Sequence, residues 1–286
     1  MQILIVGSGG YIGRNLVKKL SGFGVNVIKS SSSIPGLFEP KSGIISDSFS
    51  IPAGTDCVIY LSQSPYYRQL PDRAEHLLGV NTISPIKIAT LARHSGVKKF
   101  VYASTGNVYA PSFSPLSEAD LIRRDNWYSL SKIHAEECLL NFSADLEVVC
   151  ARIFGVYGPS QTDKLVPNLI NSIKSQLPIY LQPQGNVKQY GLNISLCYID
   201  DLCDIFTSIV NSQVEFSGVI NVAGNEVINI GDIATEIGRL LNINPMIYYT
   251  EVPRKLDLIS NNSKLINLYN PTFTPFIAGI KKTLDL

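Results

Sequence analysis

A tyrosine and a lysine stand four residues apart in the stretch WYSLSK, residues 127–132. At this spacing Tyr128 and Lys132 share one face of a helix. A phenol has a pKa near 10, so a tyrosine that acts as a base near pH 7 needs about 4 kcal/mol of help, and a neighbouring ammonium group favours the phenolate. Such a pair could move a proton to or from a hydroxyl group while a hydride moves at the same carbon. Taken alone, the spacing is more typical of a solvated helix face.

The glycine-rich stretch GSGGYIG offers a place for a phosphate group. Gly7, Gly10 and Gly13 follow a short apolar run and precede a helical pattern. Glycines allow a tight turn and close approach of the backbone to a pyrophosphate, and the helix N-terminus adds free N–H groups and a partial positive charge. A strand before and a helix after are the context that a dinucleotide-binding motif requires.

The residues after the second apolar run bear on the choice of dinucleotide. Folds of this kind that prefer NAD place an acid there, to bind the adenosine ribose. This chain has VIKSSSS instead, so Lys29, Ser30 and Ser31 offer a cation and hydroxyl groups where an acid would repel a 2′-phosphate. The pattern favours NADP over NAD, and a polar loop that binds neither group strongly is the alternative. Asp47 in IISDSF is a further candidate contact for the adenine end.

Short apolar runs alternate with helical patterns along the first half of the chain. The runs are QILIVG, VNVIKS, CVIYLS, KKFVYAST and LEVVCARIFG, and the clearest helical patterns lie at 81–94 and 128–140. The second of these should begin at a cap formed by Asp125 or Asn126. Alternation of this kind predicts an α/β fold with a Rossmann-type, doubly wound parallel sheet. We expect a dinucleotide-binding domain over 1–158, to which 190–225 returns, and a smaller C-terminal substrate-binding lobe mainly over 159–286.

Composition excludes several classes of function. The net charge of +1 gives no basic surface for nucleic acid and no polybasic patch for a membrane. The five cysteines lack metal-type spacing and the three histidines are isolated, so we expect buried thiols and no metal site. No apolar run approaches the roughly 18 residues of a membrane span, and the chain opens on a strand pattern without a charged leader. We therefore expect a cytoplasmic protein.

The motifs and their order resemble the extended short-chain dehydrogenase/reductases of the nucleotide-sugar epimerase/dehydratase family. The similarity covers most of the chain. It includes GSGGYIG, VIYLSQS in place of the family's V-I-H-L-A-A, GVNTISP, YASTGNVYA, YSLSKIHAE, ARIFGVYGP, YIDDLCD, GVINVAG and PRKLDLISNNSK.

The resemblance implies a role for each matching residue. Thr105 would hydrogen-bond the sugar oxygen, Tyr128 would be the acid/base, and Lys132 would lower the Tyr128 pKa and hold the nicotinamide ribose. The expected cofactor-binding residues are Gly7, Gly10, Tyr11, Ile12, Gly13, Lys29, Ser30, Ser31, Asp47, Leu61, Ser62, Asn81, Ser104 and Lys132. The expected substrate-binding residues are Thr105, Tyr128, Lys188, Arg254 and Asp257. Structural alternatives stay open, in which Asn81 caps a helix, Ser104 caps a strand end, or Arg254 pairs with a surface acid.

These roles leave three candidate functions, a reductase, an epimerase and a non-catalytic sensor or scaffold, once dehydration is set aside. Gly106 and Asn107 stand where dehydratases of this family carry an acid pair, so dehydration is disfavoured. A 4-keto-sugar reductase that uses NADPH is favoured slightly over a nucleotide-sugar 4-epimerase that recycles NAD. A sensor or scaffold that binds dinucleotide without turnover is less favoured, because Tyr128 and Lys132 are both present. The resemblance also implies a nucleotide-diphosphate sugar as partner and a homodimer.

Overall fold

The computed structural model describes residues 1–185 and 187–286, without the side chains of residues 187 and 188. The chain divides into two compact units, each assembled from separate stretches of sequence. Unit 1 contains Met1–Val108, Leu121–Arg152 and Cys203–Ile220, and unit 2 contains Tyr109–Asp120, Ile153–Leu202 and Asn221–Leu286. In the described parts of both units, no helix is long and apolar enough to cross a bilayer.

A six-stranded sheet with the order β11-β5-β4-β3-β1-β2 forms the centre of unit 1. The strands are β1 (Gln2–Val6), β2 (Asn26–Ser30), β3 (Cys57–Tyr60), β4 (Lys99–Thr105), β5 (Glu147–Ile153) and β11 (Gly218–Val222). Strands β2, β1, β3 and β4 run parallel, with Val6 opposite both Ser30 and Tyr60. All four residues of β3 are buried, as expected for a strand that is covered on both faces. The predicted Rossmann-type parallel sheet is confirmed.

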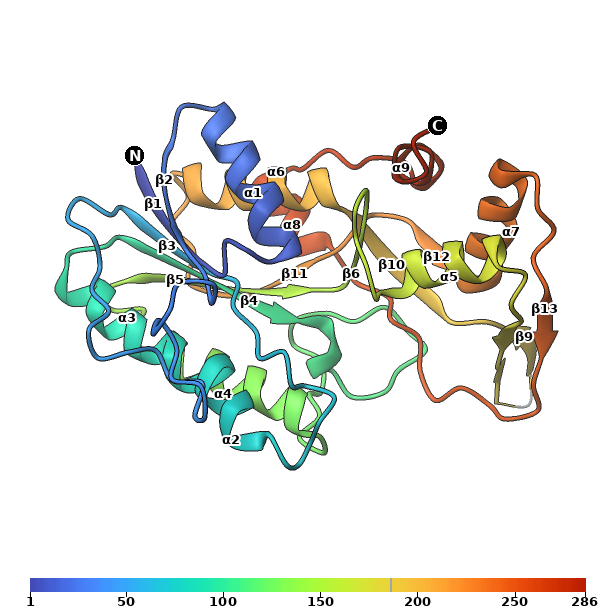
Figure 1. Cartoon of the computed structure of the whole chain (residues 1–286), viewed down its shortest axis with the longest axis horizontal. Helices are drawn as coiled ribbons and strands as arrows, with labels where there is room; N and C mark the ends of the chain where they lie inside the picture. Colours follow the sequence, from blue (N-terminus) through green and yellow to red (C-terminus); the bar gives the residue numbers. More distant parts are fainter. Residues whose placement is uncertain (186) are drawn as a thin grey trace. The chain divides into compact units, whose positions relative to one another are not determined.

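Helices cover both faces of this sheet (Figure 1). Helices α1 (Tyr11–Gly22) and α6 (Ile199–Asn211) lie on one face, and α2 (Ala74–Leu78), α3 (Ser84–His94) and α4 (Trp127–Leu140) on the other. The core beneath α3 and α4 joins apolar side chains of the strands, such as Val58 and Phe100, to Ile88 and Leu139 of the helices. Burial of these apolar side chains is the main force that holds the layers together.

The order of the strands fixes where a ligand can bind. The chain passes from β1 outward to β2 and then returns across β1 to β3. The direction of winding therefore reverses between β1 and β3, and open α/β sheets bind ligands at the carboxyl ends of the strands beside such a reversal. Gly7 follows β1 and Leu61 follows β3 at this edge.

Unit 2 contains three small sheets and four helices in its described part. One sheet has the order β12-β10-β6, and two pairs are formed by β13 with β7 and by β8 with β9. The strands are β6 (Gly155–Tyr157), β7 (Ile179–Leu181), β8 (Pro183–Gln184), β9 (Val187–Tyr190), β10 (Asn193–Tyr198), β12 (Val227–Asn229) and β13 (Ile247–Tyr249). The helices are α5 (Leu165–Lys174), α7 (Ile230–Leu241), α8 (Ser263–Tyr269) and α9 (Phe276–Thr283).

Candidate active site

The glycine loop between β1 and α1 has the shape of a phosphate cradle. Gly7 has φ +96°, and a Cβ atom on it would lie 2.6 Å from the Ser62 backbone nitrogen. A Cβ on Gly13 would lie 2.3 Å from the Gly7 carbonyl oxygen. These two glycines are therefore required by packing.

The packing around Gly10 is looser than the packing around Gly7 and Gly13. A Cβ there would meet only the Gly7 carbonyl oxygen, at an ordinary 3.4 Å, so the protein itself leaves room for a side chain. Gly10 is also the N-cap of α1, whose first turn carries no acidic residue. The bare helix N-terminus fits a pyrophosphate that approaches the backbone closely.

The end of β2 lies beside this loop and carries no acid. The Ser30 carbonyl oxygen accepts hydrogen bonds from the Gly7 nitrogen at 2.7 Å and the Ser8 nitrogen at 3.0 Å. The Ser31 side chain lies next to Gly9, because a Cβ atom on Gly9 would be 3.3 Å from the Ser31 Cβ. Lys29 is exposed at the penultimate position of β2. The three predicted residues are thus at the edge of the cradle.

Asp47 has an ionic partner of its own. Its carboxylate, which is fully exposed, pairs with the Lys87 ammonium on α3. The hydrogen bond from Lys87 lowers the Asp47 pKa. The adenine contact expected for Asp47 stays a prediction.

The first turns of α4 present the tyrosine and the lysine. The Asn126 side chain accepts a hydrogen bond from the Ser129 nitrogen at 2.9 Å, which confirms the predicted cap. Tyr128 is half-buried and its hydroxyl donates to Gln63 Oε1 at 3.2 Å. Lys132 is buried, and its Nζ donates to the Ala103 carbonyl at 2.8 Å and lies 4.7 Å from the centre of the Tyr102 ring.

Burial acts on both ionisable groups. It raises the Tyr128 pKa to about 12, against an opposing hydrogen bond with Thr105, the last residue of β4. It lowers the Lys132 pKa to about 7, against the attraction of Glu136. Without ligand the tyrosine is therefore protonated at neutral pH. The expected influence of Lys132 on Tyr128 stays a prediction.

Asn81 connects the loop after β3 with α4. It is fully buried inside a π-helical segment, η1 (Gly79–Ile83), so it does not cap a helix. Its Oδ1 accepts from the Ser64 nitrogen at 3.1 Å, and its Nδ2 donates to Ser131 Oγ at 3.0 Å. Ser131 Oγ donates to the Tyr128 carbonyl at 2.8 Å. The chain of hydrogen bonds fixes Gln63 and Tyr128 relative to each other.

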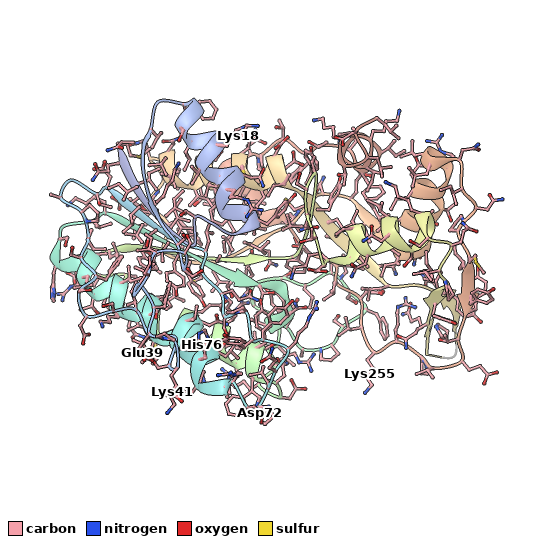
Figure 2. The ribbon with its side chains drawn as sticks, in the orientation of Figure 1. Lys18, Glu39, Lys41, Asp72, His76 and Lys255 are labelled. Atoms are coloured by element: carbon pink, nitrogen blue, oxygen red, sulfur yellow. The ribbon has the colours of Figure 1, made fainter. Side chains whose placement is uncertain are left out.

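His76 supports the same loop from α2. Its Nδ1 lies 2.9 Å from Ser64 Oγ, and burial lowers its pKa, which favours the neutral imidazole. Figure 2 shows His76 beside the loop that carries Glu39 and Lys41. The hydroxyl of Ser64 is thus paired on one side while its backbone is held by Asn81 on the other.

A buried ion pair lies behind Lys132. Arg152 Nη2 donates to Glu136 Oε2 at 2.6 Å, and both side chains are at most 5% exposed. Ser104 Oγ, expected to bind cofactor, donates to the same carboxylate. Neither Glu136 nor Arg152 belongs to a motif that predicts a site, although a glutamate one helical turn after Lys132 is a usable signal.

The substrate residues expected in unit 2 are engaged with one another. Arg254 Nε donates to Asp257 Oδ1 at 2.9 Å, and its Nη1 donates to the Gln189 carbonyl at 2.7 Å. Asp257 also accepts from the Asn193 nitrogen at 2.9 Å. Arg254 thus pairs with a buried acid and not with the surface acid of the alternative, and the expected substrate contacts of both residues stay a prediction. The side chain of Lys188, in β9, lies outside the described residues.

The cysteines form no disulfide and no metal site in the described part of the chain. All five cysteines are free thiols, and Cys138 on α4 is exposed whereas we expected only buried thiols. Among the described residues, no three His, Cys, Asp or Glu side chains are grouped so as to hold a metal ion.

Known proteins share both the sequence pattern and the fold. A family model described as the NAD dependent epimerase/dehydratase family matches residues 3–231. The chain is 26% identical over 258 residues to UDP-glucose 4-epimerase of Vibrio cholerae, covering 84% of this chain and 76% of that one. It is 26% identical over 167 residues to dTDP-4-dehydro-6-deoxyglucose reductase of Escherichia coli, covering 55% and 50% of the two chains. The solved structure of MoeE5 with UDP-glucuronic acid and NAD matches with a TM-score of 0.81 at 22% identity, covering 100% of this chain and 98% of that one.

Proposed function

Because the chain belongs to the NAD dependent epimerase/dehydratase family, we propose that it moves a hydride at C4 of a nucleotide-activated sugar and that it works as a 4-keto-sugar reductase. The observation that carries this proposal is the Tyr128 hydroxyl, held between Gln63 and Thr105 at the carboxyl ends of β3 and β4. The glycine cradle lies at the same sheet edge, next to Ser62. The site therefore combines a dinucleotide loop with a proton donor.

The reaction assigns a separate task to each residue. A dinucleotide bound at the cradle would supply the hydride to C4. Tyr128 donates its proton to the carbonyl oxygen, and the Thr105 hydroxyl holds that oxygen by a hydrogen bond. Lys132, when charged, favours the phenolate that remains and binds the nicotinamide ribose.

The residues after Thr105 argue against elimination of water. Gly106 and Asn107 form a short 3₁₀ turn, η2 (Gly106–Val108), directly after β4. Neither side chain can act as acid or base, whereas a dehydratase needs both beside the sugar ring. The product should therefore keep its hydroxyl groups.

NADPH is the proposed reductant. Lys29 and Ser31 stand where an acid would repel the 2′-phosphate, and both flank the loop that would hold the pyrophosphate. The ammonium group of Lys29 is exposed and free to reach an anion.

A 4-epimerase is the second candidate. It is supported by the Vibrio cholerae relative, a UDP-glucose 4-epimerase that matches 84% of this chain. Tyr128, as the phenolate, would then remove a proton from the C4 hydroxyl and later return one, while Thr105 and Lys132 keep their tasks. In this case NAD would stay bound through both half-reactions. For either reaction we propose a nucleotide-diphosphate sugar as substrate, with Arg254 and Asp257 as contacts, and expect a cytoplasmic homodimer.

Mass spectrometry of incubations with panels of nucleotide sugars and 4-keto nucleotide sugars tests the proposal. Each incubation is run with and without NADPH. A reductase adds two hydrogens to a 4-keto sugar only when NADPH is present. An isomer of unchanged mass without NADPH would identify the epimerase, and loss of water would refute both assignments.

A further inference from the structure

Gln63 stands at an unusual place in the loop after β3. In VIYLSQS it takes the position of the last alanine of the V-I-H-L-A-A pattern. Its neighbours are fixed, because Ser62 packs on Gly7 and the Ser64 nitrogen donates to Asn81 Oδ1 at 3.1 Å. The Gln63 side chain is exposed, yet its backbone has little freedom.

The amide of Gln63 contacts the hydroxyl group that performs the proposed chemistry. Tyr128 Oη donates to Gln63 Oε1 at 3.2 Å. This hydrogen bond requires the phenol to keep its proton, so it stabilises the neutral form of Tyr128. An alanine at position 63 has no side-chain acceptor and could not make it.

Other groups face the same phenol. Tyr67, from the loop after β3, lies 6.0 Å from the Tyr128 ring, and the Arg68 guanidinium lies 5.3 Å from the Tyr67 ring. Tyr102 of β4 interacts with it electrostatically. On α4 itself, Lys132 is directed to the Ala103 carbonyl. Gln63 is thus the hydrogen-bond acceptor of Tyr128 among the described contacts.

We propose that Gln63 is a positioning residue that holds Tyr128 protonated and in place, so that the resting enzyme meets its substrate with a proton donor ready. This role deepens the proposed function and depends on it for its catalytic meaning. During reduction the phenol O–H bond breaks while an O–H bond forms on the sugar C4 oxygen, and C4 receives the hydride of the dihydronicotinamide. Before this transfer, the carbonyl oxygen of the bound substrate replaces Gln63 as the acceptor of the Tyr128 hydrogen bond.

The protonation of Tyr128 can be measured without any substrate. Protein labelled with ¹³Cζ-tyrosine is titrated by NMR, and the Tyr128 resonance is assigned by its loss in Tyr128→Phe. The Gln63→Met variant keeps the size of the side chain but removes the acceptor. We expect the phenolate-to-phenol ratio at pH 10.5 to be about tenfold higher in Gln63→Met than in the wild type.

Two further variants serve as controls for the titration of Tyr128. Gln69→Met, an exposed glutamine in the same loop, should leave the Tyr128 titration unchanged. Gln63→Glu keeps the acceptor and adds a negative charge, so it should lower the phenolate fraction below that of the wild type. Equal titration of Tyr128 in wild type and Gln63→Met, or a lower phenolate fraction in Gln63→Met, would overturn the proposal.

The role of Gln63 in catalysis is tested separately, by the pH dependence of the reduction rate. If a substrate is reduced, the alkaline limb of the rate profile should move down by about one pH unit in Gln63→Met. An altered titration with no reduction of any sugar would refute the proposed function and leave the contact between Gln63 and Tyr128 standing. A rate profile that does not move, despite an altered titration, would refute the role of Gln63 in catalysis.

Discussion

The Glu136 carboxylate accepts hydrogen bonds from Arg152 Nη2 at 2.6 Å and Nε at 3.0 Å, one helical turn beyond Lys132. The two side chains are at most 5% exposed, so each charge is compensated mainly by the other and little by water. The pair also places a negative charge near the Lys132 ammonium, where it raises the Lys132 pKa against the effect of burial. A structural ion pair therefore influences the charge of a proposed catalytic residue.

Glu136→Gln should destabilise unit 1 strongly. The substitution leaves the Arg152 guanidinium buried without a counter-charge, which costs about 3 to 5 kcal/mol. Chemical denaturation measures the free energy of unfolding. Glu137→Gln is the matched control, because Glu137 pairs with Arg124 on the surface and should cost less than about 1 kcal/mol. Similar losses in the two variants would contradict the role of the buried pair.

Lys132 should make stability depend on pH. Its pKa is about 7 in the folded chain and 10.5 ordinarily, so between these values the unfolded chain binds more protons. The free energy of unfolding of the wild type, relative to Lys132→Met, should therefore rise with pH by about 1.4 kcal/mol per pH unit, and fall as the pH drops toward 7. Urea denaturation from pH 7.5 to 9.5 measures the difference. Parallel curves for the two proteins would show that Lys132 keeps an ordinary pKa.

Two glycines of the cradle should respond differently to alanine. Gly7→Ala forces a side chain into a left-handed conformation and against the Ser62 nitrogen, so thermal unfolding should reveal a loss of about 2 kcal/mol or more. Gly10→Ala has room on the protein side and should cost at most about 1 kcal/mol. Calorimetric titration should nevertheless show that Gly10→Ala weakens dinucleotide binding at least about tenfold. Unchanged affinity in that variant would place the pyrophosphate elsewhere.

Ser31→Asp should reverse the preference for dinucleotide. A carboxylate at the end of β2 accepts hydrogen bonds from the adenosine ribose of NAD and repels the 2′-phosphate of NADP. We expect the ratio of the two dissociation constants to change by at least about tenfold in favour of NAD. Ser143→Asp, which places the same charge in the turn after α4, should leave the ratio unchanged. A wild-type protein that already prefers NAD would refute the interpretation of Lys29 and Ser31.

Tyr128→Phe should abolish turnover while the site remains assembled. Loss of the proton donor should lower kcat by about 10² to 10⁴-fold, with dinucleotide affinity unchanged. Tyr67→Phe keeps the neighbouring ring and should change kcat only a few-fold. The assay uses whichever nucleotide sugar the mass spectra identify. Activity of Tyr128→Phe within a few-fold of the wild type would remove Tyr128 from the mechanism.

Local sequence patterns were enough to predict the parallel sheet, the glycine cradle and the first residue of α4. Continuous apolar runs indicate buried parallel strands, and Asn126 caps its helix through a residue only three positions away. The hydrogen bonds from Tyr128 to Gln63 and from Asn81 to Ser131 join residues 65 and 50 positions apart. Such contacts depend on the register of the sheet and helices, which no local pattern contains. For the same reason, sequence could suggest a partner for Arg254 but could not show that the partner is the buried Asp257.

The discontinuous make-up of unit 1 has a consequence for biosynthesis. Strand β5 is complete at residue 153, but α6 and β11, which complete the helix layer and the edge of the sheet, end only at residues 211 and 222. A chain emerging from the ribosome therefore cannot close the six-stranded sheet until the unit 2 stretches Tyr109–Asp120 and Ile153–Leu202 have also been made. Until then the edge of β5 stays open, and this is the stage at which a nascent chain most needs protection from aggregation.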